Sequence, residues 1–72
     1  MNIFWTAEIR IIQEIPSMEG LYYEGLIQND VRGRVGLIKT HLITHDWKDE
    51  KGIRYLTDID GSIYRVVTDK CQ

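Results

Sequence analysis

The chain lacks the cross-links that stabilise many very small domains. It contains one cysteine, Cys71, in 72 residues, so no disulfide can form within the chain. A lone thiol is typical of reducing compartments, and we expect a cytoplasmic location with Cys71 in a loose tail from about residue 69. Stability must then come from a thin core or from a partner subunit.

Long apolar runs are also missing. No window approaches the ~20 apolar residues that cross a bilayer, and the first eight residues lack the features of a signal peptide. We therefore expect no membrane contact. Apolar residues make up 43% and charged residues 28% of the chain, which is typical of a folded globular protein. The length predicts one domain spanning residues 1–72.

Charge of one sign does not dominate either. Nine basic and eleven acidic residues give a formal net charge of −2. A duplex-DNA binder normally carries a strong basic excess, because phosphate neutralisation supplies most of its non-specific affinity. The balance therefore disfavours a nucleic-acid partner, although a local basic patch is compatible with it.

Alternation of apolar and polar residues is what the sequence does have. In segment 2–15 the apolar residues mostly share one parity, which predicts a strand with one buried face, Trp5 included. Phe4 and Ile12 break the polar parity, so this strand is expected to bend. The further strands that we predict cover 21–28, 34–47, 53–57 and 62–68. Within 34–47 a helical turn also fits the spacing, but β-branched residues favour a bent or bulged strand.

Turn-forming residues separate these segments at 16–20, 29–33, 48–52 and 58–61. The Asp60-Gly61 pair is a strong hairpin signal, and Gly25 inside a strand indicates a bulge or a close backbone contact. The pattern predicts an all-β fold: about five antiparallel strands in a meander, as a small barrel or a strongly bent sheet. An open sheet would leave unpaired edges, which is compatible with a homodimer.

One short stretch resembles a catalytic motif. Asp58-Ile59-Asp60-Gly61-Ser62 resembles the Asp-x-Asp-Gly-Thr/Ser motif of the haloacid dehalogenase-like phosphatases. The resemblance implies Asp58 as nucleophile and Asp60 as proton carrier beside a magnesium ion. Those enzymes carry the motif after the first strand of a much longer doubly wound sheet, whereas here it lies near the C-terminus. We therefore predict a hairpin turn at these residues.

Metal ligands are equally sparse. His41 and His45 would lie ~13 Å apart on a strand, too far for one zinc ion, and we interpret them as surface residues. A calcium loop from Asp58 would need a bidentate glutamate at its twelfth position, where Asp69 stands. We predict no metal, no cofactor and no catalytic residue, and hence a protein that is not an enzyme.

Aromatic residues are the remaining resource. Tyr22 and Tyr23 are adjacent, so in a strand they face opposite sides, and Trp47 lies between charged residues. Exposed tyrosine and tryptophan beside arginine are typical of interface hot spots. The residues that we predict to bind a partner are Tyr22, Tyr23, Trp47, Arg54, Tyr55 and Tyr64.

The expected function is a small protein-binding regulator or inhibitor that covers a site on a larger partner. Accessory proteins of bacteriophages and mobile elements that block a host defence or regulatory complex have this profile. One alternative is a barrel that binds single-stranded nucleic acid. It would use the basic residues Arg32, Arg34, Lys39, Arg54 and Arg65 beside Tyr22, Tyr55 and Tyr64. Acids interleaved with these residues would count against it. The other alternative is a structural subunit that assembles with itself.

Overall fold

The computed structural model describes residues 4–68 of the chain. The expected loose tail with Cys71, and the first two residues of the expected strand 2–15, lie outside the described residues. The strands, in chain order, are β1 (Ala7–Ser17), β2 (Gly20–Gln28), β3 (Gly36–Lys39), β4 (Ile43–Lys48), β5 (Arg54–Asp58) and β6 (Ile63–Val66). Over the described range no helix is present that could span a membrane.

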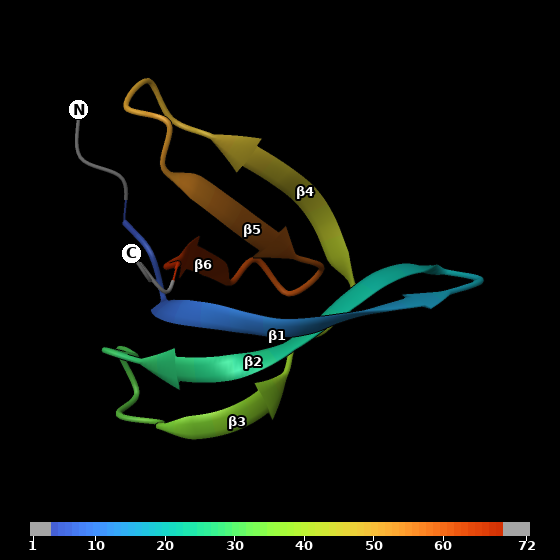
Figure 1. Ribbon diagram of the computed structural model, residues 1–72, viewed down its shortest axis with the longest axis horizontal. Helices are drawn as coiled ribbons and strands as arrows, with labels where there is room; N and C mark the ends of the chain where they lie inside the picture. The colour runs from blue at the N-terminus through green and yellow to red at the C-terminus, as the bar shows by residue number, and fades with distance from the viewer. Residues whose placement is uncertain (1–3, 69–72) are drawn as a thin grey trace.

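The strands close into a small barrel. β1, β6, β5, β4 and β2 are neighbours in that order, and β2 pairs back with β1, while β3 adds to β2 outside the ring (Figure 1). Every pairing is antiparallel except β1 with β6. A meander of five strands has an odd number, so its first and last strands run in the same direction and the closing pair is parallel. The predicted all-β fold is confirmed, in its barrel form.

The predicted strand 34–47 is present as two pieces along one edge of β2. β3 pairs with Glu24–Ile27, whereas β4 meets β2 only where Ile43 lies opposite Leu21. Between them, Thr40 donates its N–H to the Tyr23 carbonyl at 2.8 Å. The chain therefore bends without forming a helical turn, as the β-branched residues favoured.

β1 and β2 together form an arm that projects beyond the barrel (Figure 1). β1 continues past Pro16 to Ser17, which lies opposite Gly20, so the predicted turn 16–20 is tighter than expected. Pro16 is tolerated in this strand because β6 pairs only with Ala7–Ile9. On the side of β1 away from β2, the missing N–H of proline therefore faces no partner strand.

A bulge bends β1 where the sequence pattern is interrupted. The register with β2 shifts between Ile11 and Gln13, and the extra residue, Ile12, is 57% exposed. Gly25 lies beside the bulge, where a Cβ atom would approach the Arg10 carbonyl oxygen to 2.4 Å. The predicted close contact at Gly25 is confirmed, and only glycine fits there.

The core consists of side chains from β1, β2, β5 and β6. Its fully enclosed members are Ala7, Ile9, Tyr23, Ile27, Leu56 and Tyr64. The predicted buried parity of the first strand therefore holds over Ala7 and Ile9. The prediction that Trp5 is buried in this strand is not met, because Trp5 precedes β1 and is half-buried. The Arg65 guanidinium lies over the Trp5 ring, 6.0 Å from the ring centroid.

Candidate functional site

The six predicted partner-binding residues lie in separate parts of the barrel. Tyr23, Tyr55 and Tyr64 are only 1%, 4% and 3% exposed, so their rings are not available to a partner in this structure. Sequence periodicity assigned them to faces but could not say that the barrel encloses them. Tyr22, Trp47 and Arg54 are half-buried and remain candidates for contact.

Trp47 and Tyr55 form a stacked pair across β4 and β5. Their ring centroids lie 4.6 Å apart with an interplanar angle of 22°. Trp47 donates its indole N–H to Thr57 Oγ1 at 3.0 Å, and Tyr55 donates its hydroxyl to Asp49 at 3.3 Å. Burial raises the pKa of Tyr55. Trp47 is thus largely engaged with its own sheet, which accounts for the loss of the exposure expected from its charged neighbours.

Arg54 is held by internal partners as well. It donates to both carboxylate oxygens of Asp46, at 2.9 and 2.7 Å, and to the Tyr23 hydroxyl at 3.0 Å. Hydrogen bonding by Arg54 lowers the pKa of Asp46, and the same contact raises the pKa of Arg54. The arginine is therefore neutralised and positioned within the protein.

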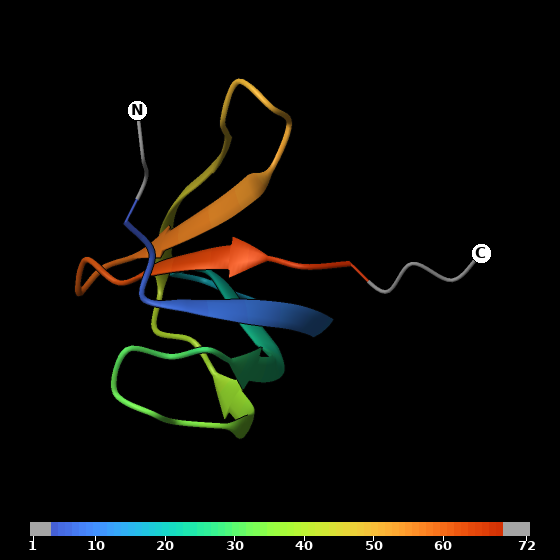
Figure 2. The same cartoon turned by 90° about the vertical axis from the view of Figure 1, so that its left-hand side faces the viewer.

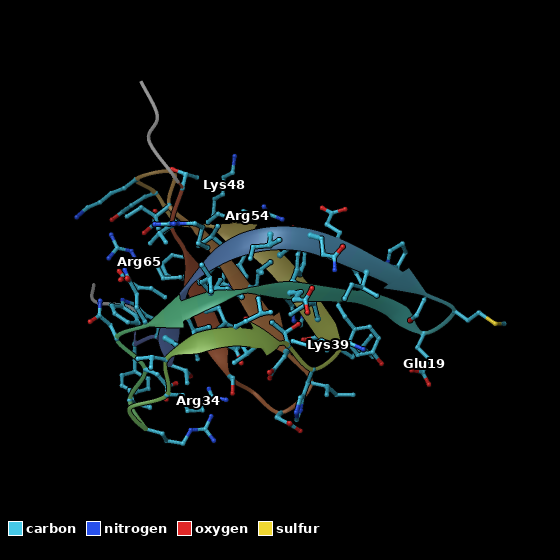
Figure 3. The ribbon with its side chains drawn as sticks, turned by 60° about the horizontal axis from the view of Figure 1, so that its bottom comes forward. Glu19, Arg34, Lys39, Lys48, Arg54 and Arg65 are labelled. Atoms are coloured by element: carbon cyan, nitrogen blue, oxygen red, sulfur yellow. The ribbon has the colours of Figure 1, made fainter. Side chains whose placement is uncertain are left out.

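An open hollow of about 610 Å³ lies around Tyr22, and we call it the Tyr22 hollow. Three segments that are distant in sequence surround it: the β1–β2 arm, the link from β3 to β4, and the β5–β6 turn. Figure 3 shows Glu19 near the tip of the arm and Lys39 on β3. The lining residues are Glu19, Tyr22, Lys39, Thr40, His41, Leu42 and Ile59.

Tyr22 is oriented by contacts on two sides of the ring. Its hydroxyl donates to Glu19 at 3.0 Å, and this hydrogen bond to a carboxylate raises the pKa of Tyr22. The Lys39 ammonium lies 5.0 Å from the ring centroid, within range of a cation–π interaction. The ring is therefore presented in a fixed orientation, which lowers the entropy cost of binding.

The opposite rim of the hollow is held to the link between β3 and β4. Ile59 donates its backbone N–H to the Leu42 carbonyl at 2.8 Å, and His41 pairs with Asp60. The side chain of Ile59 nevertheless remains 61% exposed. The hollow thus combines an apolar rim with a tyrosine and a lysine on a preformed support.

The stretch that resembles a phosphatase motif forms the β5–β6 turn. Asp58 is 4% exposed, and one of its carboxylate oxygens accepts the N–H groups of Asp60 at 3.0 Å and Ser62 at 2.9 Å. Gly61 has a φ of 89°, as a turn of this kind requires. The predicted hairpin turn is confirmed, and the carboxylate that matches the nucleophile serves as a turn acceptor.

Residues 4–68 contain no cluster of three or more histidine, cysteine, aspartate or glutamate side chains that could hold a metal ion. His41 and His45 are both exposed, as expected. His41 pairs with Asp60 alone, and His45 Nδ1 lies 3.1 Å from the Thr44 hydroxyl.

Acids interleave with the basic residues proposed for nucleic-acid binding. Arg34 bonds Asp30, which accepts four hydrogen bonds and has a lowered pKa because of them. Arg65 bonds Glu8 at 3.1 Å, and Glu8 also accepts a hydrogen bond from Asn29, the residue before Asp30. Both arginines are therefore paired with carboxylates of the protein itself.

Comparisons of the chain with protein-family models, with curated proteins and with solved structures find no match. The geometry of the Tyr22 hollow therefore carries the functional argument. The sequence analysis named Tyr22 and, for the nucleic-acid alternative, Lys39, but it did not include Ile59. A signal for Ile59 was present, because an apolar residue inside the turn Asp-Ile-Asp-Gly has no strand neighbour to cover it.

Proposed function

We propose that the protein is a small protein-binding regulator or inhibitor, which covers a site on a larger partner through the Tyr22 hollow. The observation that carries this proposal is the convergence of three segments on an open hollow with an exposed isoleucine, a tyrosine and a lysine. Tyrosine and apolar anchors surrounded by polar groups are the usual composition of interface hot spots. No reaction is required for this role.

The charge arrangement supports a protein partner over a nucleic acid. Three arginines are already paired with Asp30, Asp46 and Glu8, and binding to phosphates would have to displace these carboxylates. A net charge of −2 adds to this cost. A bacteriophage or mobile-element accessory protein that acts in the cytoplasm on a host complex is the setting that we propose for it, on the basis of its small size and single cysteine.

The test compares two exposed isoleucines. Ile59, on the hollow, is 61% exposed and Ile12, on the β1 bulge, is 57% exposed, so Ile59→Asp and Ile12→Asp are matched changes. Immobilised wild type and both variants are exposed to lysate of the source cell with and without nuclease treatment, and the affinity for each retained protein is then measured. We expect Ile59→Asp to weaken binding at least about 30-fold, as for a hot spot, and Ile12→Asp to leave it unchanged.

Two results would contradict the proposal. Equal retention by wild type and Ile59→Asp would show that the hollow is not the binding surface. Retention that disappears with nuclease in every sample would favour the single-stranded nucleic-acid alternative. Far-UV circular dichroism of each variant establishes that the fold is intact, which we expect because both side chains are exposed.

A further inference from the structure

Among residues 4–68, β3 (Gly36–Lys39) has a neighbouring strand on one side only. It stands at the end of the strand order, next to β2, and outside the closed ring. Figure 1 shows it at the lower edge of the molecule with no strand beyond it, and the view turned by 90° in Figure 2 agrees. Such an edge presents backbone N–H and C=O groups with which another strand can pair.

The hydrogen bonds of Thr40 identify the free groups of this edge. Thr40 donates its N–H to the Tyr23 carbonyl of β2. Residues of an antiparallel strand alternate between pointing their backbone groups toward the neighbour and away from it. Ile38 therefore points toward β2, as Thr40 does, whereas Leu37 and Lys39 point away. Each of the latter two offers one donor and one acceptor at the free edge.

Exposed apolar side chains lie beside these groups. Leu26 of β2 is opposite Leu37 of β3 in the ladder, so both lie on the same face, and they are 41% and 56% exposed. Val35, immediately before β3, is 78% exposed. Removing such apolar surface from water is favourable, and a strand added at the edge would cover it.

We propose that a second copy of this chain covers the edge. The two β3 strands would pair antiparallel about a twofold axis centred on Leu37, so that the N–H and C=O of Leu37 in each copy meet the C=O and N–H of the other. The outer face then carries an unbroken row of four leucines, Leu26 and Leu37 from each copy. The backbone groups and the leucine side chains of this edge thus match the same groups of a second copy.

Charge selects this register among those that the hydrogen bonds allow. A pairing centred on Lys39 would oppose two ammonium groups, which is destabilising. A pairing of Leu37 with Lys39 of the second copy would break the leucine row. With the axis at Leu37, the Lys39 side chains of the two copies lie on opposite sides of the axis, and like charges do not meet.

The thin core supplies the reason for a second copy. A domain of 72 residues buries only about 60% of the surface that its unfolded chain exposes, and association is one of the usual remedies. The inference goes beyond the proposed function, because the edge and the Tyr22 hollow are separate surfaces that share only Lys39. A dimer would present two hollows to a partner.

Sedimentation equilibrium of the wild-type protein tests the proposal directly. Because β3 is short, the interface belongs to the weak class, and we expect the mass to rise from 8.5 kDa toward twice that value as the concentration approaches about 1 mM. Leu37→Asp should reduce the association constant at least tenfold by placing two carboxylates face to face. Ile59→Asp, of similar exposure, should leave association unchanged.

The same two variants separate this inference from the proposed function. Leu37→Asp should still retain the larger partner, and Ile59→Asp should still dimerise. Wild-type protein that stays monomeric to about 1 mM overturns the inference, and so does a dimer that survives Leu37→Asp.

Hydrogen exchange of the wild type gives a readout that needs no variant. The Leu37 amide should become protected as the concentration rises, whereas the Thr40 amide, already bonded to Tyr23, should not change. A Leu37 amide that exchanges equally fast at low and high concentration would exclude the proposed pairing even if a dimer forms.

Discussion

The closed ring of the barrel encloses a leucine side chain, whereas the edge formed by β3 leaves a leucine side chain exposed. In the ring, Leu56 is 0% exposed and packs among core side chains from β1, β2 and β6. At the edge, Leu37 is 56% exposed and lies opposite Leu26, which is 41% exposed. The comparison teaches that apolar character alone does not identify the core of so small a protein. Its position relative to the closed ring decides whether a leucine is buried or remains exposed.

Truncation of these two leucines should give the largest difference between the regions. We expect Leu56→Ala to lower the free energy of unfolding by about 2–5 kcal/mol, because it removes contacts and leaves a cavity. Leu37→Ala should change it by less than about 0.5 kcal/mol. Urea titration followed by circular dichroism measures both, at concentrations low enough to avoid association. If both variants lowered the free energy of unfolding by similar amounts, Leu37 would contribute to folding as Leu56 does.

Two glycines allow the same contrast between a packed and an open position to be tested at the backbone. Gly25→Ala places a Cβ 2.4 Å from the Arg10 carbonyl oxygen and 2.9 Å from the Ile9 side chain. We expect this substitution to lower the free energy of unfolding by about 1–3 kcal/mol or more. Gly52 has a φ of 84° but no atom within 4 Å of an added Cβ, so Gly52→Ala should cost only about 1–2 kcal/mol for its left-handed backbone. Thermal unfolding of both variants separates the clash from the conformational cost. An equal loss would mean that β1 and β2 can move apart at the bulge.

The smallest expected difference is in how the ion pairs of Asp30 and Asp46 contribute to stability at low pH. Hydrogen bonds from Arg34 lower the pKa of Asp30, and hydrogen bonds from Arg54 lower that of Asp46. A lowered folded-state pKa contributes stability that is complete above about pH 4 and is lost as the pH falls through the folded value. The protein should therefore lose stability below about pH 4.

Asn variants assign this loss to a region. The Asp30 side chain is 0% exposed and that of Asp46 is 45% exposed, so Asp30→Asn should flatten the acid dependence of the melting temperature more than Asp46→Asn does. At pH 7 the exposed pair at Asp46 is worth less than about 1 kcal/mol. If Asp46→Asn reduced the acid dependence of the melting temperature more than Asp30→Asn, the expected order of the two ion pairs would be wrong.

Local signals made most of the fold predictable. Alternation located the strands, the interruption at Ile12 located the bulge, and Asp60-Gly61 located a hairpin turn. The parallel closure of β1 on β6 joins residues from the two ends of the chain, which no short window records. The same is true of β3 and β4, which share one edge of β2 because of tertiary pairing.

The candidate site was less predictable, for a physical reason. Alternation placed Tyr22 and Tyr23 on opposite faces but did not say which face was inside. The parity that Tyr23 shares with the buried Gly25 and Ile27 could have settled it. The Tyr22 hollow also depends on Ile59, 37 positions further along the chain, and such a convergence exists only after closure.

That closure has a consequence for how the protein is made. Thr6 accepts a hydrogen bond from Ile63, 57 residues away, and Ala7–Ile9 pairs with Tyr64–Val66. Contacts between such distant residues form slowly, because the intervening loop must first be closed. On the ribosome, β1 can pair with β2 early, but the ring cannot close until β6 has left the exit tunnel. The barrel therefore folds after translation of its last strand, and during that delay the open edge of β1 is the segment most in need of protection from other chains.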